Sequence, residues 1–191
     1  MTFRLRETGL AAVVVLWTTM AAGSLLAGFD LLGDRPLSHL GTERASALLF
    51  SGGLAVAALL LLAFHGYVRQ RFPASPTFSA AMLVGMAGQL VAALVPIGGE
   101  GPAHRVHTTS ALVLGACLPV LMWRFAAAQP PGPWRRLCYG LFWAEALACA
   151  VGLWLSARSI APVAEILPAA VFHSWIVAVT LASGETRPAW G

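Results

Sequence analysis

Two histidines in the middle of the chain are spaced so that they could hold a metal ion together. His104 and His107 stand three residues apart, so on a helix both imidazole rings lie on the same face. Two imidazole nitrogens become part of a zinc site when a further ligand completes it. Asp34 is our first choice for that ligand, and three other side chains of the same segments stay open for the role: Asp30, Glu100 and His39. The pattern therefore indicates a candidate Zn²⁺ site.

A candidate nucleophile lies in the same segment as Asp34. Ser38 follows four residues after Asp34 and directly precedes His39. A serine hydroxyl or a metal-bound water could attack an ester or a lipid headgroup, which makes Asp34, Ser38 and His39 candidate catalytic residues. A structural interpretation stays open beside this one. Ser38 can cap a helical turn, and Asp34 can form a solvated ion pair with Arg35 worth about 0–1 kcal/mol.

Three polar side chains fall inside otherwise apolar stretches. If these stretches are helices, Glu145, His173 and Gln89 lie about 12, 13–14 and 16 Å from the same membrane face. A charge near the middle of a membrane helix costs about 2.5–3.5 kcal/mol, so Glu145 needs a partner or a proton. We predict that Glu145 and His173 face each other, with Gln89 as a third member. Such a group could bind the polar part of an apolar ligand or relay protons, or it could be a hydrogen-bonded clasp worth about 0.6 kcal/mol.

The elements that must position these residues are six apolar stretches separated by charged segments. About 20 apolar residues in a helix cross a hydrocarbon layer of about 30 Å, and each stretch is long enough. We therefore predict an all-α fold, a polytopic bundle of six transmembrane helices that forms one domain over residues 1–191. The predicted spans are approximately residues 9–29, 45–68, 78–96, 105–124, 137–157 and 162–183.

The composition supports a membrane protein and excludes several other classes. Of the 191 residues, 58% are hydrophobic and only 10% are charged, whereas a soluble domain carries about 25% charged residues. This excludes a soluble enzyme, a disordered chain and a nucleic-acid-binding module. The formal net charge of +4 is the balance of 12 arginines and 8 acidic residues. The placement of the arginines fits membrane topology better than nucleic-acid binding.

The arginines are distributed unevenly between the two sides of the predicted bundle. Eight lie on the side of the two termini and four lie on the other side, with most of the acids. The eight are Arg4, Arg6, Arg69, Arg71, Arg124, Arg135, Arg136 and Arg187. The positive-inside rule then predicts that both termini are cytoplasmic. The absence of Lys and Asn is typical of a GC-rich bacterial genome, so we expect a bacterial cytoplasmic membrane.

The segment around Asp34 carries a family resemblance. Asp34-Arg35-Pro36-Leu37-Ser38, followed by Gly41 and an apolar span, resembles the bacterial domain-of-unknown-function 998 family. A third span that ends at Pro96, before a histidine-bearing start of the fourth, resembles it too. The resemblance covers approximately residues 29–123 and implies six membrane spans. It implies no catalytic residue, because the family has no established biochemistry.

These observations lead to three functional hypotheses. The first is a binding or accessory protein that holds a lipid or a hydrophobic small molecule through Glu145, His173 and Gln89. The alternative is a metal-dependent hydrolase or lipid-modifying enzyme that acts at the outer headgroup level through His104, His107 and Asp34, with Zn²⁺ as the one candidate cofactor. A small secondary transporter is the third, although the chain is short and shows no inverted repeat. Membrane lipids are the expected partners, nucleic acid is not, and the oligomeric state stays open.

Overall fold

Six long helices and one short 3₁₀ helix make up the described chain. A computed structural model describes residues 2–95, 97 and 101–182. The helices are α1 (Thr2–Ala27), η1 (Leu37–Gly41), α2 (Ala47–Arg71), α3 (Pro76–Leu94), α4 (Pro102–Ala128), α5 (Pro133–Ser156) and α6 (Ala161–Leu181). The six α-helices are each long and apolar enough to cross a membrane. The predicted all-α architecture with six spans is confirmed.

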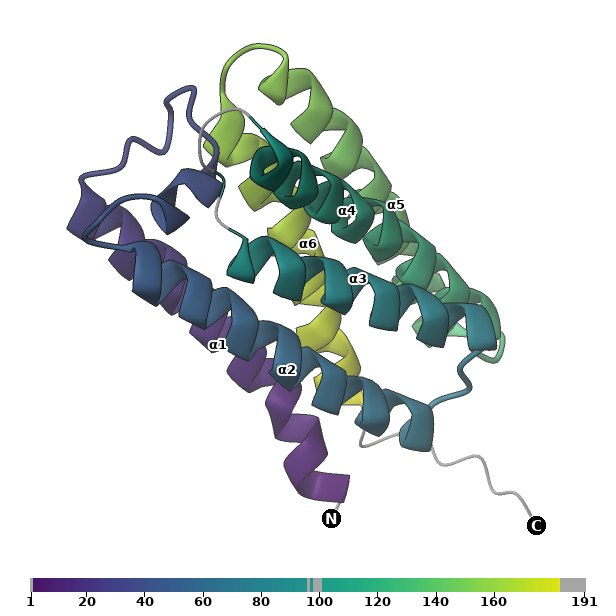
Figure 1. The fold of residues 1–191 in the computed structure, drawn as a ribbon. Helices are drawn as coiled ribbons and strands as arrows, with labels where there is room; N and C mark the ends of the chain where they lie inside the picture. The colour runs from purple at the N-terminus through teal and green to yellow at the C-terminus, as the bar shows by residue number, and fades with distance from the viewer. Residues whose placement is uncertain (1, 96, 98–100, 183–191) are drawn as a thin grey trace.

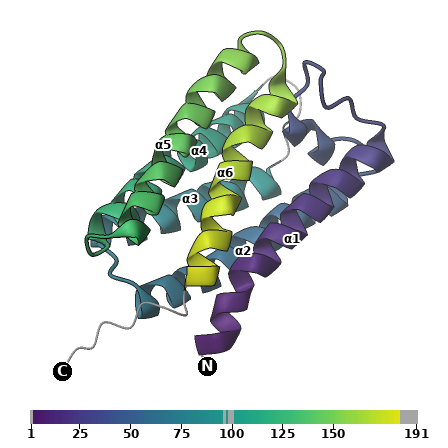
Figure 2. The same ribbon diagram turned by 180° about the vertical axis from the view of Figure 1, so that it is seen from behind.

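The helices form an up-and-down bundle in which successive helices run antiparallel (Figure 1). Each α-helix packs against the next one in sequence, and α6 also packs against α1. Helix α6 lies behind α3 in Figure 1 and in front of it in Figure 2, which shows the bundle from the other side. We call the end where α1 begins and α6 finishes the N-terminal end, and the opposite end, which carries η1, the distal end.

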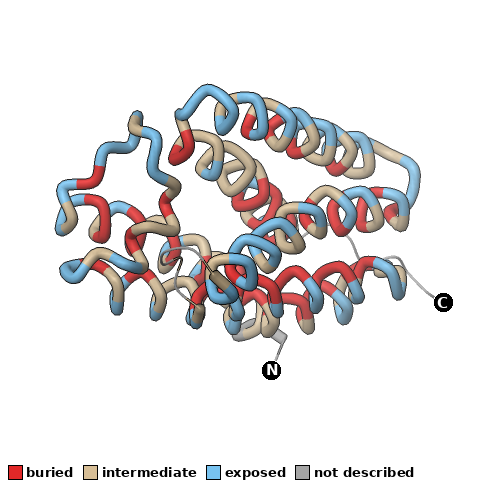
Figure 3. Tube along the Cα trace, turned by 45° about the horizontal axis from the view of Figure 1, so that its top comes forward, coloured by how far each residue is buried: buried red, intermediate tan, exposed pale blue. Residues whose placement is uncertain are grey.

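The outer surface of the bundle is apolar. Buried positions follow the inner sides of the helices and exposed positions follow their outer sides (Figure 3). Each α-helix exposes a large aliphatic side chain, among them Leu25, Leu59, Leu83, Leu112, Leu147 and Leu181. A surface of this kind is stable in lipid and not in water. The structure therefore fits an integral, multi-pass membrane protein.

Small residues set the closest approaches between helices. A Cβ atom added at Gly88 of α3 would lie 2.8 Å from the Ser110 carbonyl oxygen of α4. One added at Gly152 of α5 would lie 2.6 Å from the Ala164 carbonyl oxygen of α6. Because lipid gives no hydrophobic force between helices, such close backbone packing is a main source of their association. Gly152 therefore marks the face of α5 that meets α6.

Aromatic side chains fill the bundle interior in its N-terminal half. Phe78 of α3, Phe125 of α4 and Trp175 of α6 are fully buried. The rings of Phe125 and Trp175 lie perpendicular to each other with centroids 5.2 Å apart, a favourable edge-to-face geometry. Residues of α2 and α5 join this cluster. The cluster fixes the helices around it, and through them the rotation of each polar side chain.

Among the helices that begin earlier than the sequence predicts, three begin at a proline. The predicted starts at residues 78, 105 and 137 are observed at Pro76, Pro102 and Pro133. Proline suits the first turn of a helix because its fixed φ is already helical and its missing N–H has no partner there. The hydroxyl of Ser75 also accepts a hydrogen bond from the Phe78 amide at 3.2 Å, which caps α3. The earlier start of α5 places Arg135 and Arg136 within the helix.

Candidate functional site

Glu145 lies in the interior of the bundle, on the face of α5 that meets α6. It stands seven residues before Gly152, which is about two helical turns, so both share one face of α5. Its side chain is fully buried. Its Oε1 atom accepts a hydrogen bond from the Cys149 thiol at 3.7 Å, and its Oε2 atom has no partner in the described structure. Half of this carboxyl group is thus left without hydrogen bonds.

His173 lies on α6 and faces α1. Only 6% of the residue is exposed, and its ring meets that of Trp17 edge-on, with centroids 5.8 Å apart. The Nδ1 atom is enclosed and has no hydrogen-bond partner. Among the described residues Nε2 has no partner either, although it is not enclosed. His173 is therefore a buried polar side chain whose two nitrogens are both unused.

The predicted contact between Glu145 and His173 is not found. No hydrogen bond or ion pair joins them in the described part of the chain, where Glu145 bonds to Cys149 and His173 contacts Trp17. The reason is the rotation of α6. His173 follows nine residues after Ala164, which faces α5, and nine residues turn a helix by about 180° beyond complete turns. The two residues are on adjacent helices, but His173 points away from α5.

Gln89 belongs to a third interface. Its Nε2 atom donates a hydrogen bond to the Leu54 carbonyl oxygen of α2 at 3.0 Å, and the residue is 7% exposed. This bond joins α3 to α2 and leaves Gln89 apart from the other two polar residues. For Gln89 the geometry supports the clasp that the sequence left open, since bonds of this kind contribute to helix association in lipid.

A groove between α1 and α6 exposes one edge of His173. It has a volume of about 380 Å³, and its lining consists of Val13, Trp17, Ala170, His173, Ser174 and Val177. The Ser174 hydroxyl donates to the Ala170 carbonyl oxygen of its own helix at 2.8 Å, so its proton is already used. The groove thus combines apolar walls with one imidazole that has free hydrogen-bonding capacity.

The candidate metal ligands are not gathered at the distal end. The His107 ring is 5% exposed, and its Nδ1 atom donates to the Val95 carbonyl oxygen at 2.6 Å, which ties α4 to the end of α3. His104 is half-buried and Asp34 is exposed. No three His, Cys, Asp or Glu side chains within the described ranges come together to hold a metal ion. Glu100 lies outside the described residues.

The other candidate catalytic residues belong to η1, which is fastened to the bundle. Ser38 and His39 are half-buried on this short helix. The backbone amide of Leu37 donates to the Glu165 carboxylate of α6 at 2.9 Å. Sequence reasoning assigned no role to Glu165, although an acid at the start of the last span was the available signal. Arg35 pairs with Glu43 at 2.9 Å rather than with the adjacent Asp34.

Comparison with known proteins gives a match to a family model. A family model described as "Protein of unknown function (DUF998)" matches residues 10–182, a range that includes most of α1 and all of the other helices. No curated protein and no solved structure matches the chain. An argument about activity must therefore begin from the residues themselves.

Proposed function

This chain belongs to the DUF998 family of proteins of unknown function, and we propose from its own residues that it binds a lipid-soluble molecule in the groove between α1 and α6. The observation that carries the proposal is His173, which lines this groove with both ring nitrogens unused. A buried polar atom without a partner costs about 1–3 kcal/mol. That cost falls on the enclosed Nδ1, whereas Nε2 is not enclosed, so Nε2 is the nitrogen to which a ligand in the groove can bond.

The chemistry of the groove indicates an uncharged amphiphile. A neutral imidazole has one donor and one acceptor nitrogen, so it can bond to a hydroxyl or a carbonyl group. Val13, Ala170 and Val177 offer only apolar surface around it, which suits an acyl or isoprenoid chain. Ligand pockets generally have volumes of about 300–1,000 Å³, and the groove lies within that range. The proposed ligand class is a lipid with a neutral hydroxyl or carbonyl group.

The test is photo-crosslinking of the purified full chain with a diazirine analogue of diacylglycerol. We expect labelling of peptides from α1 and α6. Ala170→Phe fills the groove and should abolish this labelling, whereas His173→Leu should reduce it about tenfold, since one hydrogen bond to a buried group is worth about 1.4 kcal/mol. Ala87→Phe, a matched substitution at an exposed position of α3, should leave the labelling unchanged. Equal labelling of wild type and Ala170→Phe would contradict the proposal.

The proposal includes an orientation and a membrane. We place the N-terminal end in the cytoplasm and the protein in a bacterial cytoplasmic membrane. Of the arginines in the described residues, seven lie at this end and four at the distal end, an excess that the positive-inside rule relates to the cytoplasmic side.

A further inference from the structure

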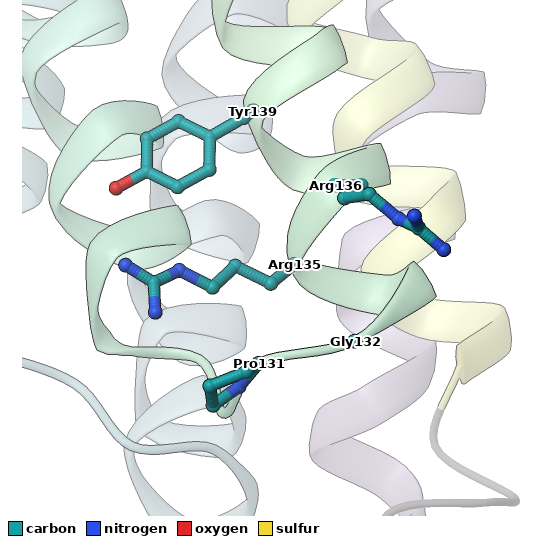
Figure 4. A pocket seen from close by; sticks show the side chains of 5 residues that line it. All are labelled: Pro131, Gly132, Arg135, Arg136 and Tyr139. Carbon is teal, nitrogen blue, oxygen red and sulfur yellow. The ribbon is translucent and has the colours of Figure 1, made fainter.

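A basic pocket lies at the N-terminal end, where α4 turns into α5. It has a volume of about 490 Å³ and is lined by Pro131, Gly132, Arg135, Arg136 and Tyr139. Figure 4 shows Arg135 and Tyr139 on the same side of α5, whereas Arg136 leaves the helix in another direction. The Arg135 guanidinium carbon lies 5.6 Å from the centroid of the Tyr139 ring. This contact orients the guanidinium group beside the pocket.

Within the described ranges, no acidic side chain pairs with the arginines of this pocket. None of the lining residues is acidic. Among the described residues the one ion pair found is Arg35 with Glu43, at the distal end. The first turn of α5 contains no acidic residue, so the positive end of its helix dipole adds to the field of the arginines. An anion would therefore bind here with favourable electrostatics.

Further along α5, towards the distal end, the same side of the helix becomes apolar. Trp143 and Leu147 follow Tyr139 at intervals of four residues and therefore continue along the same face of the helix. They are 66% and 65% exposed, which places them on the lipid-facing surface. A molecule with its anionic group at Arg135 would thus have its chains alongside Trp143 and Leu147. A basic site followed by an apolar strip matches a phospholipid, which carries an anionic group and acyl chains, and not a small soluble anion.

We propose that this pocket binds the phosphate group of an anionic membrane phospholipid. Arg135 supplies a planar pair of N–H donors, a geometry suited to two phosphate oxygens, and the Tyr139 hydroxyl is a further donor. Arginines at the end of a membrane helix attract anionic lipid headgroups electrostatically. The site is separate from the α1–α6 groove and does not depend on the proposed function.

The test is native mass spectrometry of the full chain in detergent with equal amounts of phosphatidylglycerol and phosphatidylcholine. We expect preferential retention of phosphatidylglycerol. Arg135→Gln should weaken this retention at least about tenfold, because hydrogen bonds to charged groups are individually strong. Arg69→Gln removes the same charge from an exposed position at the same end and should change retention less than about threefold. Arg135→Lys, which keeps the charge but lacks the planar pair of N–H donors, should give an intermediate retention.

Three outcomes would overturn the proposal. Equal retention of the two lipids would show that the pocket does not select an anion. Equal losses in Arg135→Gln and Arg69→Gln would show a diffuse surface charge and no site. Binding of inorganic phosphate or glycerol phosphate as tight as that of phosphatidylglycerol would show a soluble-anion site. If Arg135→Gln does not fold, the retention of phosphatidylglycerol is measured in Arg135→Lys and Tyr139→Phe instead. Wild-type retention in both variants would reject the assigned residues.

Discussion

The polar side chains inside the bundle differ in how completely their hydrogen bonds are satisfied. Gln89 donates to the Leu54 carbonyl oxygen and so joins two helices. Glu145 has one bonded oxygen and one without a partner, and His173 has no bonded nitrogen among the described residues. Polar atoms that lack partners in lipid cost free energy, so they persist where another advantage offsets that cost. For His173 the adjacent groove indicates ligand binding, whereas Glu145 lies on the face of α5 that meets α6.

This difference predicts that replacing Glu145 changes the stability of the bundle and leaves ligand binding in the groove unchanged. Glu145→Leu removes a buried oxygen without a partner and should raise the free energy of unfolding by about 1–3 kcal/mol. Glu145→Gln, which keeps a polar group of the same shape, is the matched control and should change it less. The measurement is reversible unfolding in mixed detergent micelles. Diazirine labelling of the groove should be unchanged in both variants. A loss of stability in Glu145→Leu would mean that the carboxyl group has a partner that stabilises the fold.

The helices are held at distances that depend on particular glycines. Gly152 of α5 lies where the backbone of α6 is closest, whereas Gly140 of the same helix has open space around it. Both were ordinary members of an apolar run in the sequence, because nothing in the chain tells which face of α5 meets α6. The early start of α5 could have been read from Pro133, since proline favours the first helical turn. The contact face could not, because it depends on the packing of all six helices.

These two glycines give a matched pair of substitutions. Gly152→Ala puts a methyl group against the Ala164 carbonyl oxygen, so α5 and α6 must separate, and we expect a loss of about 1–3 kcal/mol of stability. Gly140→Ala meets nothing within 4 Å and should be neutral or stabilising by up to about 1 kcal/mol, because alanine favours the helix. Thermal unfolding of both variants checks this. Equal effects would mean that α5 and α6 are not in close backbone contact.

The bundle as a whole follows from the scarcity and placement of charge. Lipid requires helices that satisfy their own backbone groups, so long uncharged runs between arginines predict spans without knowledge of any contact. Side-chain partners need the rotation of each helix about its axis, to within a fraction of a turn. The pairing of Glu145 with His173 was predicted from depth alone, and a turn of about 180° from Ala164 directs His173 to Trp17. The depth of a residue in the membrane can be read from the sequence, whereas the rotation of its helix about its own axis cannot.

The sidedness of the bundle gives the last prediction, which follows from the arginine excess at the N-terminal end. The three native cysteines are free and can be replaced. In that background Ala45→Cys places a thiol at an exposed position before α2 at the distal end, and Gln70→Cys places one at the opposite end. A membrane-impermeant maleimide should label Ala45→Cys in intact bacterial cells and Gln70→Cys only after permeabilisation. The reverse pattern would contradict the proposed orientation and put Arg135 and its pocket in the outer leaflet.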